Sequence, residues 1–401
     1  MYSLDPSNPQ FSDQSKLEKE FVRQSSVCHG CRRCFNYCTV FPSLFGLTDA
    51  KTPSKLVLDD LSTLSEQCFH CNLCYVNCPY TPPHEFAMDF PHLMEWGLLE
   101  HKSKSGISFL ERASGNMDLL PTLRKLGPLR LPVLSLSKKL IGIDPESPFP
   151  PVAKRGFLRN ATKKDPEEPV ARVVLFHTCL VENFYPELGQ DLIDVYNFLG
   201  IQVELKPFRC CGSPMLDVGD AQRLKANAEY NFKLLEESAS QGFDIVSPVP
   251  TCALMTWKEY PLILGKPSIK VYDSLEYLLK LKREKKVSFD KKMDQKVLYH
   301  APCHLRYLGV GMPGVQLMRS LGADVTQVDQ GCSGMDGGWG FKHYDVARQV
   351  GSKMMGTFRE SSTDGSVIFS TECPFAGLQI QKASGKRPMH PLQFLKKALM
   401  Q

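Results

Sequence analysis

Two short stretches near the start of the chain, each with four cysteines, constrain its structure more than any other feature. Both stretches have the spacing C-x₂-C-x₂-C-x₃-C. Three thiolates spaced in this way bind three irons of one cubane, and the fourth thiolate binds a second cubane. The spacing therefore predicts two [4Fe–4S] clusters that exchange their last ligands. The first cluster has the ligands Cys28, Cys31, Cys34 and Cys78, and the second has Cys68, Cys71, Cys74 and Cys38.

Structural zinc is the alternative for these eight thiols, because C-x₂-C pairs are also common zinc ligands. Zinc binds four ligands as two pairs, which leaves the third and fourth cysteine of each stretch without a role. Pro79 follows the second stretch, as in bacterial ferredoxins, whereas Thr39 follows the first. The pattern favours iron–sulfur clusters over zinc.

The rest of the sequence agrees with a cytoplasmic redox protein. The chain has 401 residues and fifteen cysteines, and its polar first residues lack the features of a signal peptide. The thiols are therefore expected to be reduced and to bind metal rather than to form disulfides. No apolar run of about eighteen residues is present, so no transmembrane segment is expected.

The formal charge of +5 gives no reason to expect a nucleic-acid partner. This value counts every cysteine as neutral, whereas a cubane bound by four thiolates carries a charge of roughly −2. Bound clusters would bring the protein close to neutrality.

The length of the chain predicts several domains, and its patterns predict an α-helical ferredoxin domain followed by two α/β modules. Residues 1–90 are expected to form the helical domain with both clusters. Within it, residues 52–67 begin with a Thr-Pro-Ser helix-start signal, and Val57, Leu58, Leu61 and Leu64 would share one helical face. Residues 91–170 are predicted to form a helical, proline-rich connector that ends in a linker at 145–169.

The second half of the chain contains an internal repeat. ARVVLFHTC at 171–179 corresponds to QKVLYHAPC at 295–303, and LGIQVELKPFRCCG at 199–212 corresponds to LGADVTQVDQGCSG at 321–334. FDIVSPVPTC at 243–252 corresponds to GSVIFSTEC at 365–373. One unit has therefore been duplicated. We call residues 171–285 module one and residues 295–401 module two.

Each module alternates short β-branched runs with helical segments, which predicts βαβ units and a parallel sheet. The cysteines of both modules come shortly after predicted strands. Ligands of open α/β sheets bind outside the carboxyl ends of the strands, so these cysteines are expected to converge there. Module one contributes Cys179, Cys210, Cys211 and Cys252, and module two contributes Cys303, Cys332 and Cys373.

Together with the eight ferredoxin cysteines, three segments of the modules carry a family resemblance: PTCALMTWKEYP, YHAPCHLRYLG and CSGMDGGWGF. The chain resembles the iron–sulfur subunits of anaerobic glycerol-3-phosphate dehydrogenase, glycolate oxidase and heterodisulfide reductase over about residues 20–400. The resemblance implies two ferredoxin clusters and two cysteine-rich CCG domains. It also implies that electrons come from a flavoprotein and are passed on, often to membrane quinone. Some stand-alone relatives resemble partners of rubrerythrin-type peroxidases instead.

Both modules depart from the five-cysteine CCG pattern, which in heterodisulfide reductases holds a noncubane catalytic cluster. Module one has Val249 where the closing C-x-x-C would begin, but its four remaining cysteines suffice for a third cluster. Module two has Ser333 and Ser370 in place of cysteines. Its three thiols would need His304, Asp336 or water as a fourth ligand; otherwise this copy is degenerate and structural.

Two weaker patterns remain open. Residues 309–314 match the dinucleotide fingerprint G-x-G-x-x-G, but they do not follow a predicted strand, which favours an ordinary loop. Residues 119–143 alternate leucines with five basic side chains and contain no acidic one. This segment could bind a membrane surface or a partner, or pack on the protein itself.

The leading functional hypothesis is an electron-transfer subunit that links a flavoprotein dehydrogenase, of the glycerol-3-phosphate or 2-hydroxy-acid type, to quinone or another acceptor. One alternative is a catalytic thiol or disulfide reductase that uses the Cys210–Cys211 pair or a cluster of module one. Another is an electron donor to a rubrerythrin-type peroxidase, and a third is a scaffold subunit with inert zinc. The expected location is the cytoplasm, and residues 119–143 leave open a peripheral association with the cytoplasmic face of the inner membrane.

Overall fold

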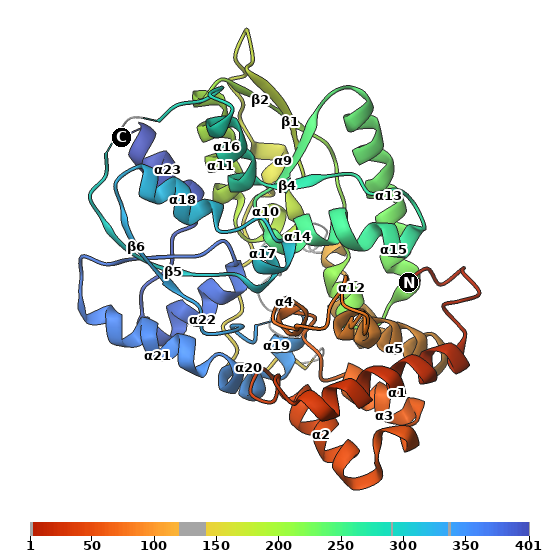
Figure 1. The fold of residues 1–401 in the computed structure, drawn as a ribbon. Coiled ribbons are helices and arrows are strands. Elements are labelled where there is room, and N and C mark those ends of the chain that lie inside the picture. The colour runs from red at the N-terminus through yellow and green to blue at the C-terminus, as the bar shows by residue number, and fades with distance from the viewer. Residues whose placement is uncertain (1–2, 120–141, 290–291, 336–337, 401) are drawn as a thin grey trace.

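The computed structural model describes residues 3–119, 142–289, 292–335 and 338–400. Figure 1 shows a helical part in red and orange, a first α/β module in yellow and green, and a second in cyan and blue. This order confirms the predicted fold class, an α-helical region followed by two parallel-sheet modules. In the described ranges, no helix is both long and apolar enough to cross a membrane.

The helical part packs around one central helix, α5 (Phe90–Ser105), in which every residue from Phe90 to Glu100 is buried. Helix α3 packs against α5, and α1 contacts both. The other elements of this part are α1 (Gln14–Cys31), α2 (Val40–Lys51), η1 (Pro53–Lys55), α3 (Leu58–Ser65) and α4 (Leu73–Val76). A helix buried on all sides is typical of the centre of a helical domain.

The helix expected over residues 52–67 is shorter than the sequence predicts. Residues Pro53–Lys55 form a separate 3₁₀ turn, and α3 begins only at Leu58. The backbone N–H of Val57 donates to the carboxylate of Asp60, which caps the helix at this point. Leu61 and Leu64 are buried as expected, whereas Val57 is 45% exposed because it precedes the helix.

The predicted connector is divided between the helical part and the first sheet. Its first residues belong to α5, and α6 (Phe109–Ser114) and η2 (Met117–Leu119) follow. The segment expected to be a linker contains α9 (Phe157–Asn160), where the ring of Phe157 is buried in the same core as Val181 and Leu192. The last part of this segment is therefore packed on module one. Most of residues 119–143, including all five basic side chains, lies outside the described residues.

Module one has a four-stranded parallel sheet with the order β2-β1-β3-β4. Its strands are β1 (Ala171–Leu175), β2 (Ile201–Leu205), β3 (Asp244–Ser247) and β4 (Val271–Asp273). Its helices are α10 (Thr178–Asn183), α11 (Pro186–Phe198), α12 (Ser213–Asp217), α13 (Ala221–Ser240), α14 (Pro250–Leu254), the π-helix η4 (Met255–Glu259), α15 (Tyr260–Leu264) and α16 (Ser274–Arg283).

Module two has a three-stranded parallel sheet with the order β6-β5-β7, so the first strand lies inside the sheet in both modules. Its strands are β5 (Lys296–His300), β6 (Asp324–Val328) and β7 (Ile368–Ser370). Its helices are α17 (Cys303–Leu308), α18 (Pro313–Ser320), α19 (Trp339–Lys342), α20 (Tyr344–Val350), α21 (Ser352–Glu360), η5 (Ser361–Thr363), α22 (Pro374–Ser384) and α23 (Pro391–Met400).

The glycine-rich segment at 309–314 joins two helices of module two. Gly309 ends α17 and Pro313 begins α18, so the segment does not follow a strand. A dinucleotide fingerprint needs a strand before it and a helix that opens within it. The match to this fingerprint is therefore only a loop between helices.

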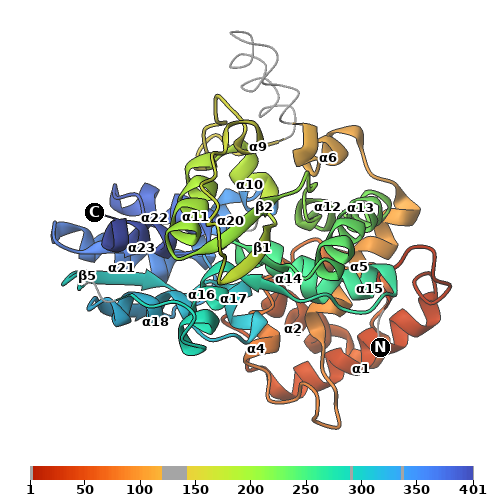
Figure 2. The same ribbon diagram turned by 90° about the horizontal axis from the view of Figure 1, so that it is seen from above.

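The three parts meet at short helices near the centre of the molecule. Helix α17 of module two contacts both α4 of the helical part and α14 of module one. Farther out, α11 contacts α23 and α16 contacts α18, which joins the two modules along their helices. Figure 2 shows α14 and α17 between the helical part and the modules. Each of these central helices lies next to one of the cysteine sets.

Candidate metal centres

The first set of thiols, which we call the first tetrad, consists of Cys28, Cys31, Cys34 and Cys78. Cys28 and Cys31 lie in the last turn of α1, and Cys78 follows α4. Burial raises the pKa of the Cys28 thiol, and the three other thiols of the set raise it further. Burial and nearby thiols raise the pKa of Cys34 to about 12. Four crowded thiols therefore need a cation to become thiolates together.

The second tetrad consists of Cys38, Cys68, Cys71 and Cys74. Burial raises the pKa of Cys74, and the thiols of Cys71, Cys68 and Cys38 raise it further. Burial likewise raises the pKa of Cys68, to which Cys38 and Cys71 add. The structure thus brings the last cysteine of each stretch to the first three cysteines of the other stretch, which is the exchange that the spacing predicts.

The backbone of the two stretches bends in the same way. Arg32 and Asn72, which follow the second cysteine of each stretch, have φ values of 53° and 58°. Such left-handed residues turn the chain sharply. The backbone N–H groups of Val40 and Phe41 donate hydrogen bonds to the sulfur of Cys38. Hydrogen bonds to the sulfur atoms are one of the factors that set the reduction potential of an iron–sulfur cluster.

The sulfur atoms of the two tetrads are not gathered as tightly as a single zinc ion would hold them. Tetrahedral zinc with Zn–S bonds of about 2.3 Å would hold its sulfur atoms about 3.8 Å apart. Among the described residues, which include all fifteen cysteines, no three sulfur atoms lie within 4.8 Å of one another. The two tetrads therefore do not match a single preformed zinc site.

Module one brings its four thiols into one buried row. Cys179 follows β1, Cys210 and Cys211 follow β2, and Cys252 follows β3, so all four lie beyond the carboxyl ends of parallel strands. The Sγ atoms of Cys210 and Cys179 are 3.5 Å apart. Cys211 interacts with Cys210 on one side and with Cys252 on the other. All four side chains are at most 9% exposed.

A glycine and a strained residue shape this row. Gly212, directly after the cysteine pair, has a φ of 99°, and a Cβ atom there would collide with the side chain of Leu224. Thr178, directly before Cys179, has a φ of 67°, which is rare for a β-branched residue. Strain of this kind persists where the surrounding structure requires it, and it is concentrated at functional sites.

Two asparagines of α13 hold the Cys210–Cys211 loop, and no motif in the sequence singles them out. Asn231 accepts from the N–H of Arg209 and donates to the carbonyl oxygens of Arg209 and Cys210. Asn227 donates to the carbonyl oxygen of Cys210 and to Asp118, which in turn accepts from the Cys210 N–H. The available signal was two asparagines four residues apart on the apolar face of a helix.

The thiols of module two are arranged differently from those of module one. Cys332 interacts with Cys303 and also with Cys71 of the second tetrad. Its sulfur accepts from the N–H of Gly334, and the third cysteine, Cys373, caps α22 at its start. Two of the three thiols of module two therefore adjoin a ferredoxin thiol rather than forming a separate row.

His304, which the sequence offers as a fourth ligand in module two, uses both ring nitrogens elsewhere. Its Nδ1 lies 2.7 Å from the hydroxyl of Thr251, and its Nε2 lies 2.8 Å from the carbonyl oxygen of His70. These contacts join the cysteine loops of all three parts of the molecule. His304 is thus a link between them and does not point at the thiols of module two. Asp336, the other candidate ligand, lies outside the described residues.

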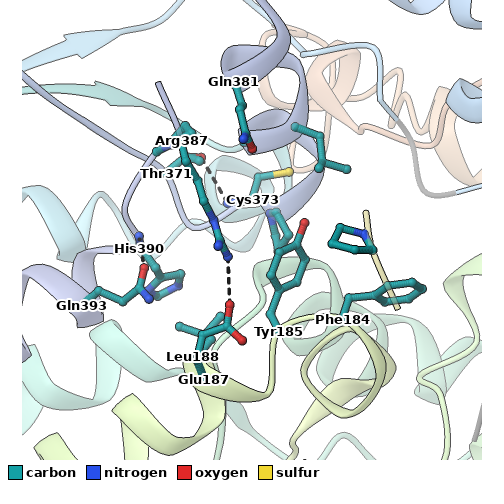
Figure 3. Close-up of a pocket in the computed structure, with 15 residues that line it drawn as sticks. Phe184, Tyr185, Glu187, Leu188, Thr371, Cys373, Gln381, Arg387, His390 and Gln393 are labelled. Atoms are coloured by element: carbon teal, nitrogen blue, oxygen red, sulfur yellow. Dashed lines mark hydrogen bonds and ion pairs between the residues drawn. The ribbon is translucent and has the colours of Figure 1, made fainter. Parts of the chain in front are cut away.

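Cys373 lines a pocket of about 250 Å³ between the two modules. Figure 3 shows its side chain beside Tyr185, with the ion pair between Arg387 and Glu187 next to it. Burial raises the pKa of Tyr185 to about 12, so this phenol is neutral at physiological pH. The pocket offers one thiol and a few polar groups.

Comparison with known proteins places these sets of cysteines in recognised domains. Residues 21–99 match the Fer4-like domain of citrate utilization protein B, and residues 173–256 and 297–381 match the cysteine-rich domain CCG. These three ranges contain all fifteen cysteines.

Several characterised proteins are similar over half of the chain or more. The C subunit of anaerobic glycerol-3-phosphate dehydrogenase from Escherichia coli (strain K12) is 30% identical over 57% of this chain and 59% of its own length. The B subunit of fumarate reductase (CoM/CoB) from Methanothermobacter marburgensis is 29% identical over 58% of this chain and 45% of its own length. Lactate utilization protein A 1 of Bacillus mycoides is 24% identical over 50% of this chain and 85% of its own length.

These matches confirm the family resemblance and support the binding of iron–sulfur clusters and a role in electron transfer. The chain spans about three fifths of the length of the first of these relatives. The chain is similar to the C subunit of anaerobic glycerol-3-phosphate dehydrogenase, and it matches one Fer4-like domain followed by two CCG cysteine-rich domains.

Proposed function

We propose that this protein is the iron–sulfur component of a dehydrogenase system, in which it carries electrons from a flavoprotein to quinone or another acceptor. The first and second tetrads would each hold one [4Fe–4S] cluster, and the four thiols of module one would hold a third. Such a cluster, when bound, takes up and releases one electron at a time. Module two, with three thiols and His304 engaged elsewhere, would be a degenerate copy without its own cluster.

The observation that carries this proposal is that the thiols of the two tetrads and of module two lie next to one another. Cys34 of the first tetrad is close enough to Cys74 of the second to affect its pKa, so the two sets are neighbours. Cys71 of the second tetrad then adjoins Cys332 of module two. A row of neighbouring thiols that links the two tetrads and reaches module two supports electron transfer from one cluster to the next. A structural metal site would not need such continuity.

The proposed partners follow from the relatives. The names glycerol-3-phosphate dehydrogenase and lactate utilization protein support a donor that oxidises glycerol-3-phosphate or a 2-hydroxy acid. Flavoproteins are the class that the family resemblance implies for this donor. Quinone at the cytoplasmic face of a membrane, or a rubrerythrin-type peroxidase, would be the acceptor.

The test uses anaerobically purified protein. It is expected to be brown, to contain about twelve irons per chain, and to lose its colour when photoreduced FMN is added as a substitute for the flavoprotein. A water-soluble quinone should then restore the colour. Zinc in place of iron, or a failure to accept electrons from FMN, would contradict the proposal.

The same preparation distinguishes electron transfer from catalysis on disulfides. A thiol or disulfide reductase would reduce an aromatic disulfide catalytically with no partner protein present. An electron-transfer protein should reduce at most as many equivalents as its clusters hold. Sustained turnover by the isolated chain would therefore favour the reductase.

A further inference from the structure

A group of three buried side chains, separate from all the cysteines, lies where the helical part meets module one. His92 and Glu95 belong to α5, and Glu259 is the last residue of the π-helix η4. One ligand atom from each of the three lies within 4.8 Å of the other two. We propose that this group binds one divalent metal ion of the first transition series through an imidazole nitrogen and two carboxylates.

His92 is already oriented as a metal ligand would be. Its Nδ1 lies 2.7 Å from a carboxylate oxygen of Asp89, which fixes the ring, and its Nε2 lies 3.0 Å from Glu259. Histidines that bind metals usually donate their other N–H to a carboxylate, because this bond sets the tautomer and the direction of the ring. Asp89 is therefore a positioning residue for the proposed ion.

The two glutamates carry oxygens that nothing in the described part of the chain satisfies. Glu95 is 2% exposed and Glu259 is 1% exposed. Neither Oε2 of Glu95 nor Oε1 of Glu259 has a hydrogen-bond partner among the described residues. Their ion-pair contacts there are with histidines, His70 at 3.8 Å from Glu95 and His92 from Glu259. Burying a carboxylate is costly unless it is paired or binds a metal.

The backbone supports a built site at this place. Residues Met255–Glu259 form a π-helical turn between α14 and α15. Insertions of this type are rare in helices and occur frequently at functional sites. Here the turn directly follows α14, which contains Cys252, and the last residue of the turn is Glu259. The unfavourable π-helical geometry therefore occurs at Glu259, the residue that contacts His92.

The donor atoms indicate which ions would fit. One imidazole nitrogen with two carboxylates is a donor set for Zn²⁺, Fe²⁺ or Mn²⁺, whereas softer ions prefer thiolates. The second tetrad lies nearby, since Glu95 is among the groups that raise the pKa of Cys68. A bound ion would tie α5 to η4 and would neutralise buried negative charge close to that tetrad.

The experiment measures metal content in the protein with its iron–sulfur clusters present. Wild-type protein is dialysed separately against Zn²⁺ and against Mn²⁺, and each ion is then counted per chain together with iron. The variants are Glu95→Gln, Glu259→Gln, the double variant and Asp89→Asn. Glu100→Gln is the matched control, because Glu100 is similarly buried on α5 but pairs with Lys104.

The wild type and Glu100→Gln are expected to bind about one Zn²⁺ or Mn²⁺ per chain at a site that contains no cysteine. The double variant should bind at least tenfold more weakly, and Asp89→Asn about 10- to 100-fold more weakly, as is typical when a group that orients a ligand is lost. Iron content should be unchanged in all of them. If the double variant loses iron, the single variants provide the comparison.

Two results would overturn the proposal. One is that the wild type takes up neither ion in stoichiometric amount. The other is that uptake is unchanged when both glutamates are replaced. In either case the group is a structural contact between α5 and η4, in which His92 pairs with Glu259. The result does not depend on whether the protein transfers electrons, because metal uptake is read without turnover.

Discussion

The two cysteine-rich modules have the same scaffold but use it differently. In both, the first strand lies inside a parallel sheet, and cysteines follow successive strands. In both, a glycine with positive φ comes shortly after the second strand: Gly212 in module one and Gly334 in module two. Module one gathers four buried thiols into one row, whereas module two has three, two of which adjoin Cys71 of the helical part.

This difference shows which features the fold itself requires. The glycine turn persists in module two although Ser333 has replaced the second cysteine of the pair. The turn therefore serves the backbone and does not depend on a full set of ligands. The arrangement of the thiols instead depends on which part of the protein each module packs against. Those of module one contact one another, and two of the three thiols of module two adjoin the second tetrad.

Replacing one of these two glycines, Gly334, by alanine should give the largest effect on stability. A Cβ atom at Gly334 would meet the backbone of Ala347, which cannot move aside, whereas at Gly212 its closest contact would be the flexible side chain of Leu224. Gly334→Ala is therefore expected to destabilise the protein by about 2–4 kcal/mol, and Gly212→Ala by about 1–2 kcal/mol.

Denaturant unfolding followed by circular dichroism would measure both glycine variants. Gly365→Ala is a suitable control, since a Cβ atom there would meet nothing within 4 Å. Equal losses at Gly212 and Gly334 would mean that the turn in module two can relax as easily as that in module one.

A smaller effect is expected from the side chains that hold the two cysteine loops. Asn231 makes four hydrogen bonds in module one, including those to Arg209 and Cys210. In module two, Gln379 donates to the carbonyl oxygens of Ser333 and Ala347 at 3.0 and 3.4 Å. Asn231→Ala should cost about 2–3 kcal/mol because it leaves buried backbone groups unpaired, and Gln379→Ala about 1–2 kcal/mol.

The iron content of the Asn231→Ala and Gln379→Ala variants gives a second comparison of the two modules. If module one holds a cluster, Asn231→Ala should also lower the iron content, because it frees the loop that carries two proposed ligands. Gln379→Ala should leave iron unchanged. Iron loss only in the Gln379 variant would reverse the roles assigned to the two modules.

The sequence was informative where chemistry depends on local spacing. The C-x₂-C-x₂-C-x₃-C stretches and the duplicated strand-then-cysteine pattern predicted which thiols the fold would bring together, because parallel strands place their carboxyl ends at one edge. The helix start at residues 52–54 was wrong by several residues, because the side chain of Asp60 caps the helix at Val57. No pattern in residue types distinguishes these two starts.

The contacts between the parts could not be predicted from the sequence. The pairing of Cys71 with Cys332, and the bonds of His304 to Thr251 and His70, depend on how α4, α14 and α17 meet. The same holds for Glu259 and His92, which are 167 residues apart in the sequence. The sequence places most of α5 in the predicted connector, and a partner of its buried His92 comes from another part of the fold.

The central claim, that module one holds a cluster and module two does not, is tested most directly by Cys211→Ser and Cys332→Ser side by side. Iron per chain and low-temperature electron paramagnetic resonance would be measured on anaerobic preparations. We predict that Cys211→Ser loses about four irons and one paramagnetic signal, while both ferredoxin signals remain. Cys332→Ser should keep its iron. Full iron in Cys211→Ser, or an equal loss in both variants, would contradict the account.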